Sequence, residues 1–120
     1  MKIAFTGHRN RIADRDTLLA LADEFPAAVW AHGGAIGFDT QVAEVATERG
    51  ILQQKHLPDY RKYGRGAPLA RNRLIVNGAD LLIACYDWRL KGGTAFTVRV
   101  AMEKGVPVRV LEPRKSDGNV

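Results

Sequence analysis

Glycines stand directly before helical spacing in the segment "HGGAIGFDTQVAEVA", residues 32–46. The first turn of a helix has unpaired N–H groups and the positive end of the helix dipole, so it attracts anions. Gly33, Gly34 and Gly37 would let a phosphate or a ribose approach those groups without meeting a Cβ atom. Asp39 would lie in the first helical turn, where it could cap N–H groups or accept a hydrogen bond from a ligand hydroxyl. A structural turn capped by Asp39 explains the same spacing equally well.

A second glycine-rich helix start occurs in "KGGTAFT", residues 91–97. Gly92 and Gly93 have no Cβ atom and would leave the backbone N–H groups accessible to a ligand. The hydroxyl groups of Thr94 and Thr97 could donate hydrogen bonds to a phosphate. Two such starts in one short chain favour a ligand site over two unrelated turns. The GxGxxG spacing of a dinucleotide site is absent.

The stretch "TGHR", residues 6–9, follows the first apolar run and predicts a sharp turn. Thr6 could contribute a hydroxyl group, and Arg9 could hold a phosphate. His8 could stack on a base or act as a general acid, and a solvated or capping histidine is the alternative.

Basic and aromatic residues alternate in "DYRKYGRGAPLARNR", residues 59–73. This pattern can follow a phosphate backbone and stack bases, although a solvated loop would also explain it. We expect Arg71 and Asn72 in the pocket and the other residues as an electrostatic approach surface. Those other residues are Tyr60, Arg61, Lys62, Tyr63, Arg65 and Arg73.

Four short apolar runs, at residues 2–6, 28–32, 80–85 and 106–111, are typical of buried strands, and residues 51–57 form a weaker fifth. Helical spacing fills the intervals, which predicts an α/β fold with a parallel sheet covered on both faces. Ligands bind such sheets at the carboxyl ends of the strands. The loops after residues 2–6, 28–32 and 80–85 have most of the loop glycines and cations, so we expect the site there. We expect one domain over residues 1–112 and a loosely ordered polar tail over residues 113–120.

Composition limits the classes of function. The 120 residues suffice for one domain without disulfides, and 18 Lys and Arg against 13 Asp and Glu give a net charge of +5, which favours anionic partners. Cys85 is the single cysteine and the three histidines lack ligand spacing, so we expect neither a metal site nor a cofactor. The only serine is Ser116, so no Ser–His–Asp triad is expected. No signal peptide or membrane-length segment is recognised, which predicts a cytoplasmic protein without membrane contact.

Four motifs occur in an order that resembles the SMF/DprA–LOG (SLOG) superfamily, especially its short stand-alone YspA/YpsA-like members. They are "TGHR", "HGGAIGFDTQVAEVA", "ARNRLIVNGADLLIA" and "KGGTAFTVRVAMEKGVPV", and the resemblance covers residues 2 to about 111. "RNRLI" is similar to the DNA-processing protein A branch, and "GGTAFT" to the "GGxGTxxE" signature of the cytokinin-activating phosphoribohydrolase branch.

The resemblance implies a Rossmann-like three-layer αβα fold with a five-stranded parallel sheet of order 3-2-1-4-5. It also implies a nucleotide-type ligand over the loops after strands one, two and four. Carried over by position, the ligand shell includes Gly7, Gly33, Gly34, Gly37, Asp39, Arg71, Asn72, Gly92, Gly93 and Thr94. Superfamily relatives often pair, which predicts a homodimer or higher homo-oligomer through an apolar helix face bearing Phe96, Val100 or Trp88.

One departure from the family pattern concerns catalysis. Thr97 stands where the phosphoribohydrolase signature has its glutamate, and a threonine cannot stabilise the positive charge that develops on the sugar when an N-glycosidic bond breaks. We therefore expect a domain that binds a nucleotide or nucleotide-derived phosphate as a sensor, sequestering protein or partner subunit. The first alternative is a nucleotide N-glycosidic-bond hydrolase or transferase that uses Asp39 or Asp87 as its carboxylate. The second is a single-stranded DNA binder.

Overall fold

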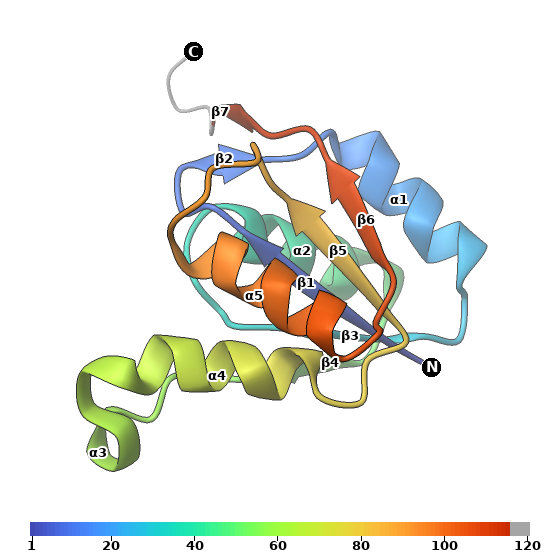
Figure 1. The fold of residues 1–120 in the computed structure, drawn as a ribbon. Helices are drawn as coiled ribbons and strands as arrows, with labels where there is room; N and C mark the ends of the chain where they lie inside the picture. Colours follow the sequence, from blue (N-terminus) through green and yellow to red (C-terminus); the bar gives the residue numbers. More distant parts are fainter. Residues whose placement is uncertain (116–120) are drawn as a thin grey trace.

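The apolar runs form a five-stranded sheet because their residues are buried on both faces; β5, for example, has no exposed residue. The structure is a computed structural model that describes residues 1–115. The strands of this sheet are β1 (Lys2–Gly7), β3 (Val29–His32), β4 (Gln53–Lys55), β5 (Leu81–Cys85) and β6 (Val108–Leu111). All neighbours pair in parallel, in the order β4-β3-β1-β5-β6. Numbered along the chain, these five strands have the predicted order 3-2-1-4-5, which is confirmed (Figure 1).

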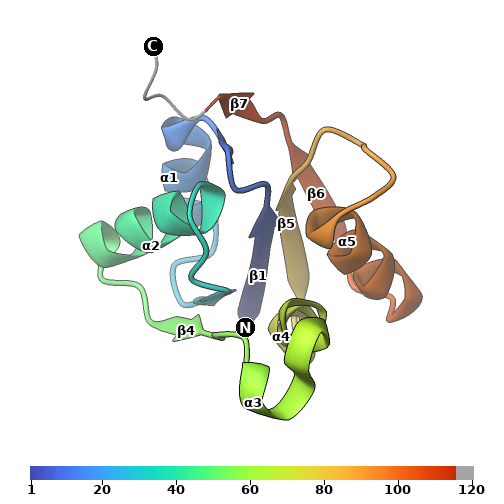
Figure 2. The ribbon, with the colours of Figure 1, turned by 90° about the vertical axis from the view of Figure 1, so that its left-hand side faces the viewer.

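Helices cover both faces of the sheet, as Figure 2 shows: α1 (Arg15–Glu24) and α2 (Phe38–Arg49) on one side, α4 (Ala67–Val76) and α5 (Gly93–Glu103) on the other. Successive residues of a strand point to opposite faces. Accordingly Phe5 packs in the core beneath α1 and α2, and Ala4 in the core beneath α4 and α5. Val100, which we expected on an exposed oligomer face, is buried in that second core. The predicted three-layer α/β architecture is confirmed.

Some short elements were not predicted. β2 (Arg11–Ile12) and β7 (Arg114–Lys115) form a separate antiparallel pair, so part of the expected tail is paired, whereas residues 116–120 lie outside the described residues. α3 (Tyr60–Tyr63) and the 3-10 turn η1 (Gly64–Gly66) lead into α4, and Figure 1 shows α3 beyond the start of α4, away from the sheet. No helix in the described part of the chain is long and apolar enough to cross a bilayer.

Candidate functional site

A cavity of about 430 Å³ opens at the carboxyl end of β1, beside the start of α5. This volume lies in the range of small-molecule sites. Ten of the fourteen residues predicted to contact a ligand line it. They are Thr6, Gly7, His8, Arg9, Asp39, Arg71, Asn72, Gly92, Gly93 and Thr94. The structure therefore brings most of the predicted site to one place.

The start of α5 is open toward this cavity. Its N-cap, Gly92, has a φ of +104°, and no side chain caps the helix. A Cβ atom at Gly92 would meet nothing within 4 Å, so the backbone there is accessible. Gly93 and Thr94 line the cavity beside it, which leaves the first helical turn available to an anion. Thr97 does not line the cavity, because its buried hydroxyl donates to the Gly93 carbonyl, 2.7 Å away.

The segment before α2 is closed by the protein itself. Asp39 Oδ2 accepts hydrogen bonds from the N–H groups of Gly33 and Ala35, each at 3.2 Å. Gly37 has a φ of +80°, and a Cβ atom there would lie 2.3 Å from the Arg9 carbonyl oxygen. Gly33, Gly34 and Gly37 do not line the cavity, so this helix start meets it through Ala35 and Asp39 and not through its glycines.

Asp39 and Arg71 are charged residues buried in the cavity wall. Burial raises the pKa of the Asp39 carboxyl, although its backbone hydrogen bonds and Arg71 act in the opposite direction. Arg71 Nη1 donates to the Gly33 carbonyl at 2.6 Å, and its Nε donates to Asn72 Oδ1 at 2.8 Å. Asn72 Nδ2 in turn donates to the Gly93 carbonyl at 3.4 Å. This chain of bonds ties the loop after β3 to the start of α5.

Gly7 and His8 extend from β1 into the cavity wall. A Cβ atom at Gly7 would lie 2.6 Å from Phe38 Cβ, so this glycine allows β1 to pack closely against α2. His8 is 8% exposed, and burial and the nearby Arg89 lower its pKa, which favours the neutral imidazole at pH 7. His8 Nε2 lies 3.3 Å from Asp87 Oδ1.

Arg89 lines the cavity, and the predicted site omitted it. Asp87, by contrast, does not line the cavity, although it was a candidate catalytic carboxylate. The hydrogen bonds from Arg89 hold the pKa of Asp87 well below its usual range. The signal that could have found Arg89 is its position: a cation in the loop after β5, shortly before the glycines that start α5.

An apolar wall faces these polar groups. Pro68, Leu69 and Ile75, all from α4, line the cavity, and their contribution was not predicted. Tyr60, Tyr63 and their basic neighbours lie outside it, on exposed α3 and η1. Within residues 59–73, Arg71 and Asn72 line the cavity as expected, and Pro68 and Leu69, which were expected outside it, line it too.

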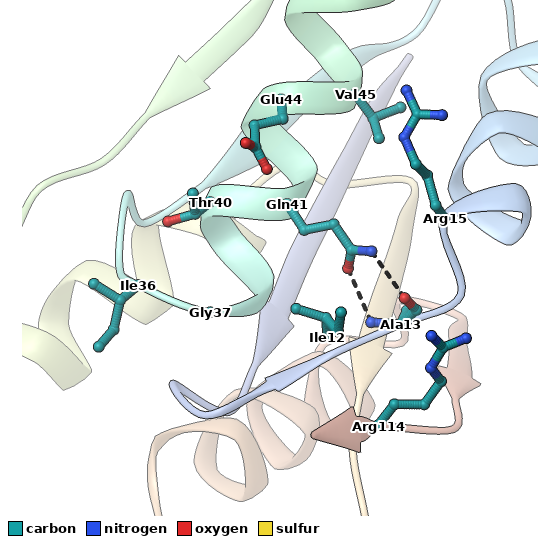
Figure 3. A pocket seen from close by; sticks show the side chains of 10 residues that line it. All are labelled: Ile12, Ala13, Arg15, Ile36, Gly37, Thr40, Gln41, Glu44, Val45 and Arg114. Atoms are coloured by element: carbon teal, nitrogen blue, oxygen red, sulfur yellow. Dashed lines mark hydrogen bonds between the residues drawn. The ribbon is translucent and has the colours of Figure 1, made fainter. Parts of the chain in front are cut away.

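A larger hollow of about 590 Å³ lies beside α2 and β2, and Gly37 is the one predicted residue that lines it (Figure 3). Gln41 crosses it: its Oε1 accepts from the Ala13 N–H at 2.9 Å, and its Nε2 donates to the Ala13 carbonyl at 2.8 Å. Arg15, which also lines it, is paired with Glu48. Ten predicted residues line the smaller cavity, whereas one lines this hollow, so the smaller cavity is the better candidate site.

Nucleophilic and metal chemistry find no support in the described residues. Cys85 is buried, and burial raises the pKa of its thiol to about 12, as expected for an inert core cysteine. Within residues 1–115 no group of three or more His, Cys, Asp or Glu side chains is placed to hold a metal ion.

The fold is similar to that of solved structures. The structural-genomics target TM1055 has a TM-score of 0.67 and 21% identity, over 89% of this chain and 71% of that one. DNA processing protein A from Streptococcus pneumoniae has a TM-score of 0.64 and 15% identity, over 97% of this chain and 52% of that one. The chain therefore shares its fold with these two proteins.

At these identities the likeness extends to the fold alone. No protein-family model matches the sequence, and no curated protein is significantly similar to it. The cavity itself is therefore the guide to the ligand of this chain.

Proposed function

We propose that the chain binds a nucleotide or a nucleotide-derived phosphate compound in the 430 Å³ cavity, as a sensor, sequestering protein or partner subunit. The observation that carries this proposal is the uncapped start of α5, where Gly92 leaves the backbone accessible. Arg9, Arg71 and Arg89 line the same cavity, and Asp39 is its only acidic lining residue. Cations and a helix N-terminus around one hollow favour an anionic ligand.

The remaining walls suit the other parts of a nucleotide. Asp39 Oδ2 accepts the two backbone hydrogen bonds, which leaves Oδ1 to accept a hydrogen bond from a ribose hydroxyl. Pro68, Leu69 and Ile75 provide apolar surface for a base. Arg71 donates to Gly33, His56 and Asn72, so it contributes mainly charge to the ligand.

The same geometry favours binding over cleavage of an N-glycosidic bond. Thr97 is fully buried and bonded within α5, and Asp87 is paired with Arg89 outside the cavity wall. Asp39 is left as the one carboxylate available to a hydrolase or transferase, and one of its oxygens already accepts two backbone hydrogen bonds.

Thermal unfolding with a panel of nucleoside mono-, di- and triphosphates tests the proposal. A ligand present at 100 times its Kd adds about 2.7 kcal/mol to the free energy of unfolding, so at least one nucleotide should raise the Tm by several degrees. Gly93→Ala should lose most of this rise, because it adds a methyl group at the cavity wall. The fold tolerates that group, since the Cβ atom would lie 3.4 Å from its nearest neighbour, Asn72 Nδ2.

Gly66→Ala is the matched control, since its Cβ atom would meet nothing within 4 Å and Gly66 does not line the cavity. This variant should retain the full rise in Tm. The proposal is wrong if no nucleotide stabilises the wild-type protein, or if Gly93→Ala is stabilised as much as Gly66→Ala.

A second candidate function is binding of single-stranded nucleic acid on the exposed surface of α3 and η1. Tyr60 and Tyr63 are 58% and 43% exposed there, interleaved with Arg61, Lys62 and Arg65. Exposed aromatic rings among cations can stack bases and follow a phosphate backbone. This surface lies outside the cavity, so the two candidates involve different residues.

A further inference from the structure

The loop between β5 and α5 holds the Arg89 side chain in one orientation. Asp87 accepts from Arg89 Nε at 2.9 Å through Oδ1 and from Arg89 Nη2 at 2.5 Å through Oδ2. The Arg89 backbone N–H also donates to Asp87 Oδ1, at 3.1 Å. Arg89 Nη1 makes no hydrogen bond to any described residue.

The loop backbone is held from both sides. Trp88 has a φ of +67°, the only positive φ among the described non-glycine residues. Such a conformation is rare for a bulky side chain, so neighbouring contacts must maintain it. The Tyr86 hydroxyl donates to the Arg89 carbonyl, and Arg99 Nη1 donates to the Leu90 carbonyl at 3.3 Å.

The orientation leaves donors of Arg89 available beside the start of α5. A guanidinium group has five N–H donors, and Asp87 occupies those along one edge. Arg89 lines the cavity together with Gly92, Gly93 and Thr94. Arg89 and the open helical turn therefore border the same volume, where the guanidinium group and the backbone N–H groups can hold one anionic group between them.

His8 also lies against Asp87, at the same carboxylate oxygen that accepts from Arg89 Nε. Its ring is more than nine-tenths buried, lines the cavity, and places Nε2 3.3 Å from Asp87 Oδ1 without a hydrogen-bond partner. Asp87 thus stands between His8 and Arg89 while lying outside the cavity wall itself.

We propose that Arg89 contacts the anionic group of the ligand, and that Asp87 is a positioning residue that holds Arg89 beside the first turn of α5. This inference rests on the proposed function and assigns Asp87 a role other than that of a catalytic carboxylate. A plain surface ion pair, which is the alternative for two partly exposed side chains, would contribute little to stability and nothing to binding.

Calorimetric titration tests the proposal with four probes: adenosine and guanosine 5′-monophosphate, and the two nucleosides without phosphate. Arg89→Gln should weaken binding of the monophosphates at least tenfold and leave nucleoside binding unchanged. Arg89→Lys keeps the charge but loses the planar guanidinium group with its paired donors. Its affinity for the monophosphates should therefore lie between those of Arg89→Gln and the wild-type protein. Lys104→Gln removes the same charge at the other end of α5 and should bind like the wild-type protein.

A double-mutant cycle tests the role of Asp87. Asp87→Asn should weaken monophosphate binding in the wild-type protein and have no further effect in Arg89→Gln, because Asp87 acts through Arg89. The Arg89 Nε–H resonance should shift in Asp87→Asn, and in the wild-type protein on addition of a monophosphate. If the ion pair were only structural, addition of a monophosphate would not shift the Arg89 Nε–H resonance.

Two results would overturn the proposal: unchanged monophosphate affinity in Arg89→Gln, or an equal effect of Asp87→Asn with and without Arg89. If none of the four probes binds the wild-type protein and the wider nucleotide panel also fails, the proposed function is wrong. Titration with inorganic phosphate then decides the Arg89 proposal separately. Phosphate binding that is lost in Arg89→Gln and kept in Lys104→Gln supports it. Equal phosphate binding by the two variants, or no phosphate binding by the wild-type protein, contradicts it.

Discussion

Asp39 and Arg71 are charged residues of the predicted ligand shell that also hold the protein together. Asp39 closes the loop after β3 by accepting from Gly33 and Ala35, and Arg71 donates to the Gly33 carbonyl. Residue type and spacing predicted both residues for the ligand shell, and both line the cavity. They could not reveal how many of the hydrogen-bonding atoms the protein itself uses, because that depends on contacts between segments 38 residues apart.

His8, which is buried, and His56, which is partly buried, predict how stability depends on pH. Burial lowers the pKa of His8 and of His56 from the ordinary value near 6.5. The unfolded chain therefore takes up protons first, so stability is fully present above pH 6.5 and is lost as the pH falls through the folded-state pKa values. The loss is at most about 1.4 kcal/mol per pH unit for each histidine.

Urea unfolding between pH 7.5 and 5.5 measures this loss. The double variant His8→Gln and His56→Gln should show a flatter dependence of the unfolding free energy on pH than the wild-type protein. Equal slopes for the two proteins would show that neither histidine is responsible.

At the scale of elements, the glycines at the two ends of α2 differ in what they allow. Gly50, at the C-terminus of α2, has a φ of +66° and no atom within 4 Å of its Cβ position. Gly37, at the N-terminus, has a φ of +80° and also lies against the Arg9 carbonyl. Gly50→Ala should therefore cost about 1 kcal/mol from backbone strain alone. Gly37→Ala should cost about 3 kcal/mol, because overpacking adds to the strain.

Denaturant midpoints of the two variants test this prediction, with Gly50→Ala as the control for the positive φ. Gly37→Ala should unfold at a clearly lower denaturant concentration. If the two midpoints coincide, the close contact between Gly37 and the loop after β1 does not stabilise the native fold.

The elements differ in how far they could be predicted from sequence. β1, β3, β5 and β6 follow apolar runs, because strands buried on both faces need apolar side chains throughout. β4 is shorter than the expected range of residues 51–57. It lies at the edge of the sheet and its residues, Gln53, Gln54 and Lys55, are polar, so an apolar pattern could not define its ends. The pair β2–β7 and the four-residue helix α3 are too short to show any periodicity.

At the scale of the whole molecule, parallel strand order explains why most residues of the candidate site could be predicted from sequence. The carboxyl ends of parallel strands share one edge, so the loops after β1 and β5 meet there. Gly33, Gly34, Gly37 and Thr97 were expected to contact the ligand, yet contacts within the protein keep them from the cavity wall. Arg89 was missed because its orientation depends on Asp87 and on the turn at Trp88, which no spacing rule predicts.

The net charge of +5 is compatible with both candidate functions, whereas the location of bound ligand separates them. Mapping of backbone amide resonances on titration with adenosine or guanosine 5′-monophosphate, and separately with a single-stranded oligonucleotide, tests the central claim most directly. We predict that a monophosphate shifts the amides of Gly93 and Thr94 strongly and those of Tyr60 to Tyr63 little. Shifts confined to α3 with the oligonucleotide, and none at the start of α5 with either monophosphate, would contradict an anion site there.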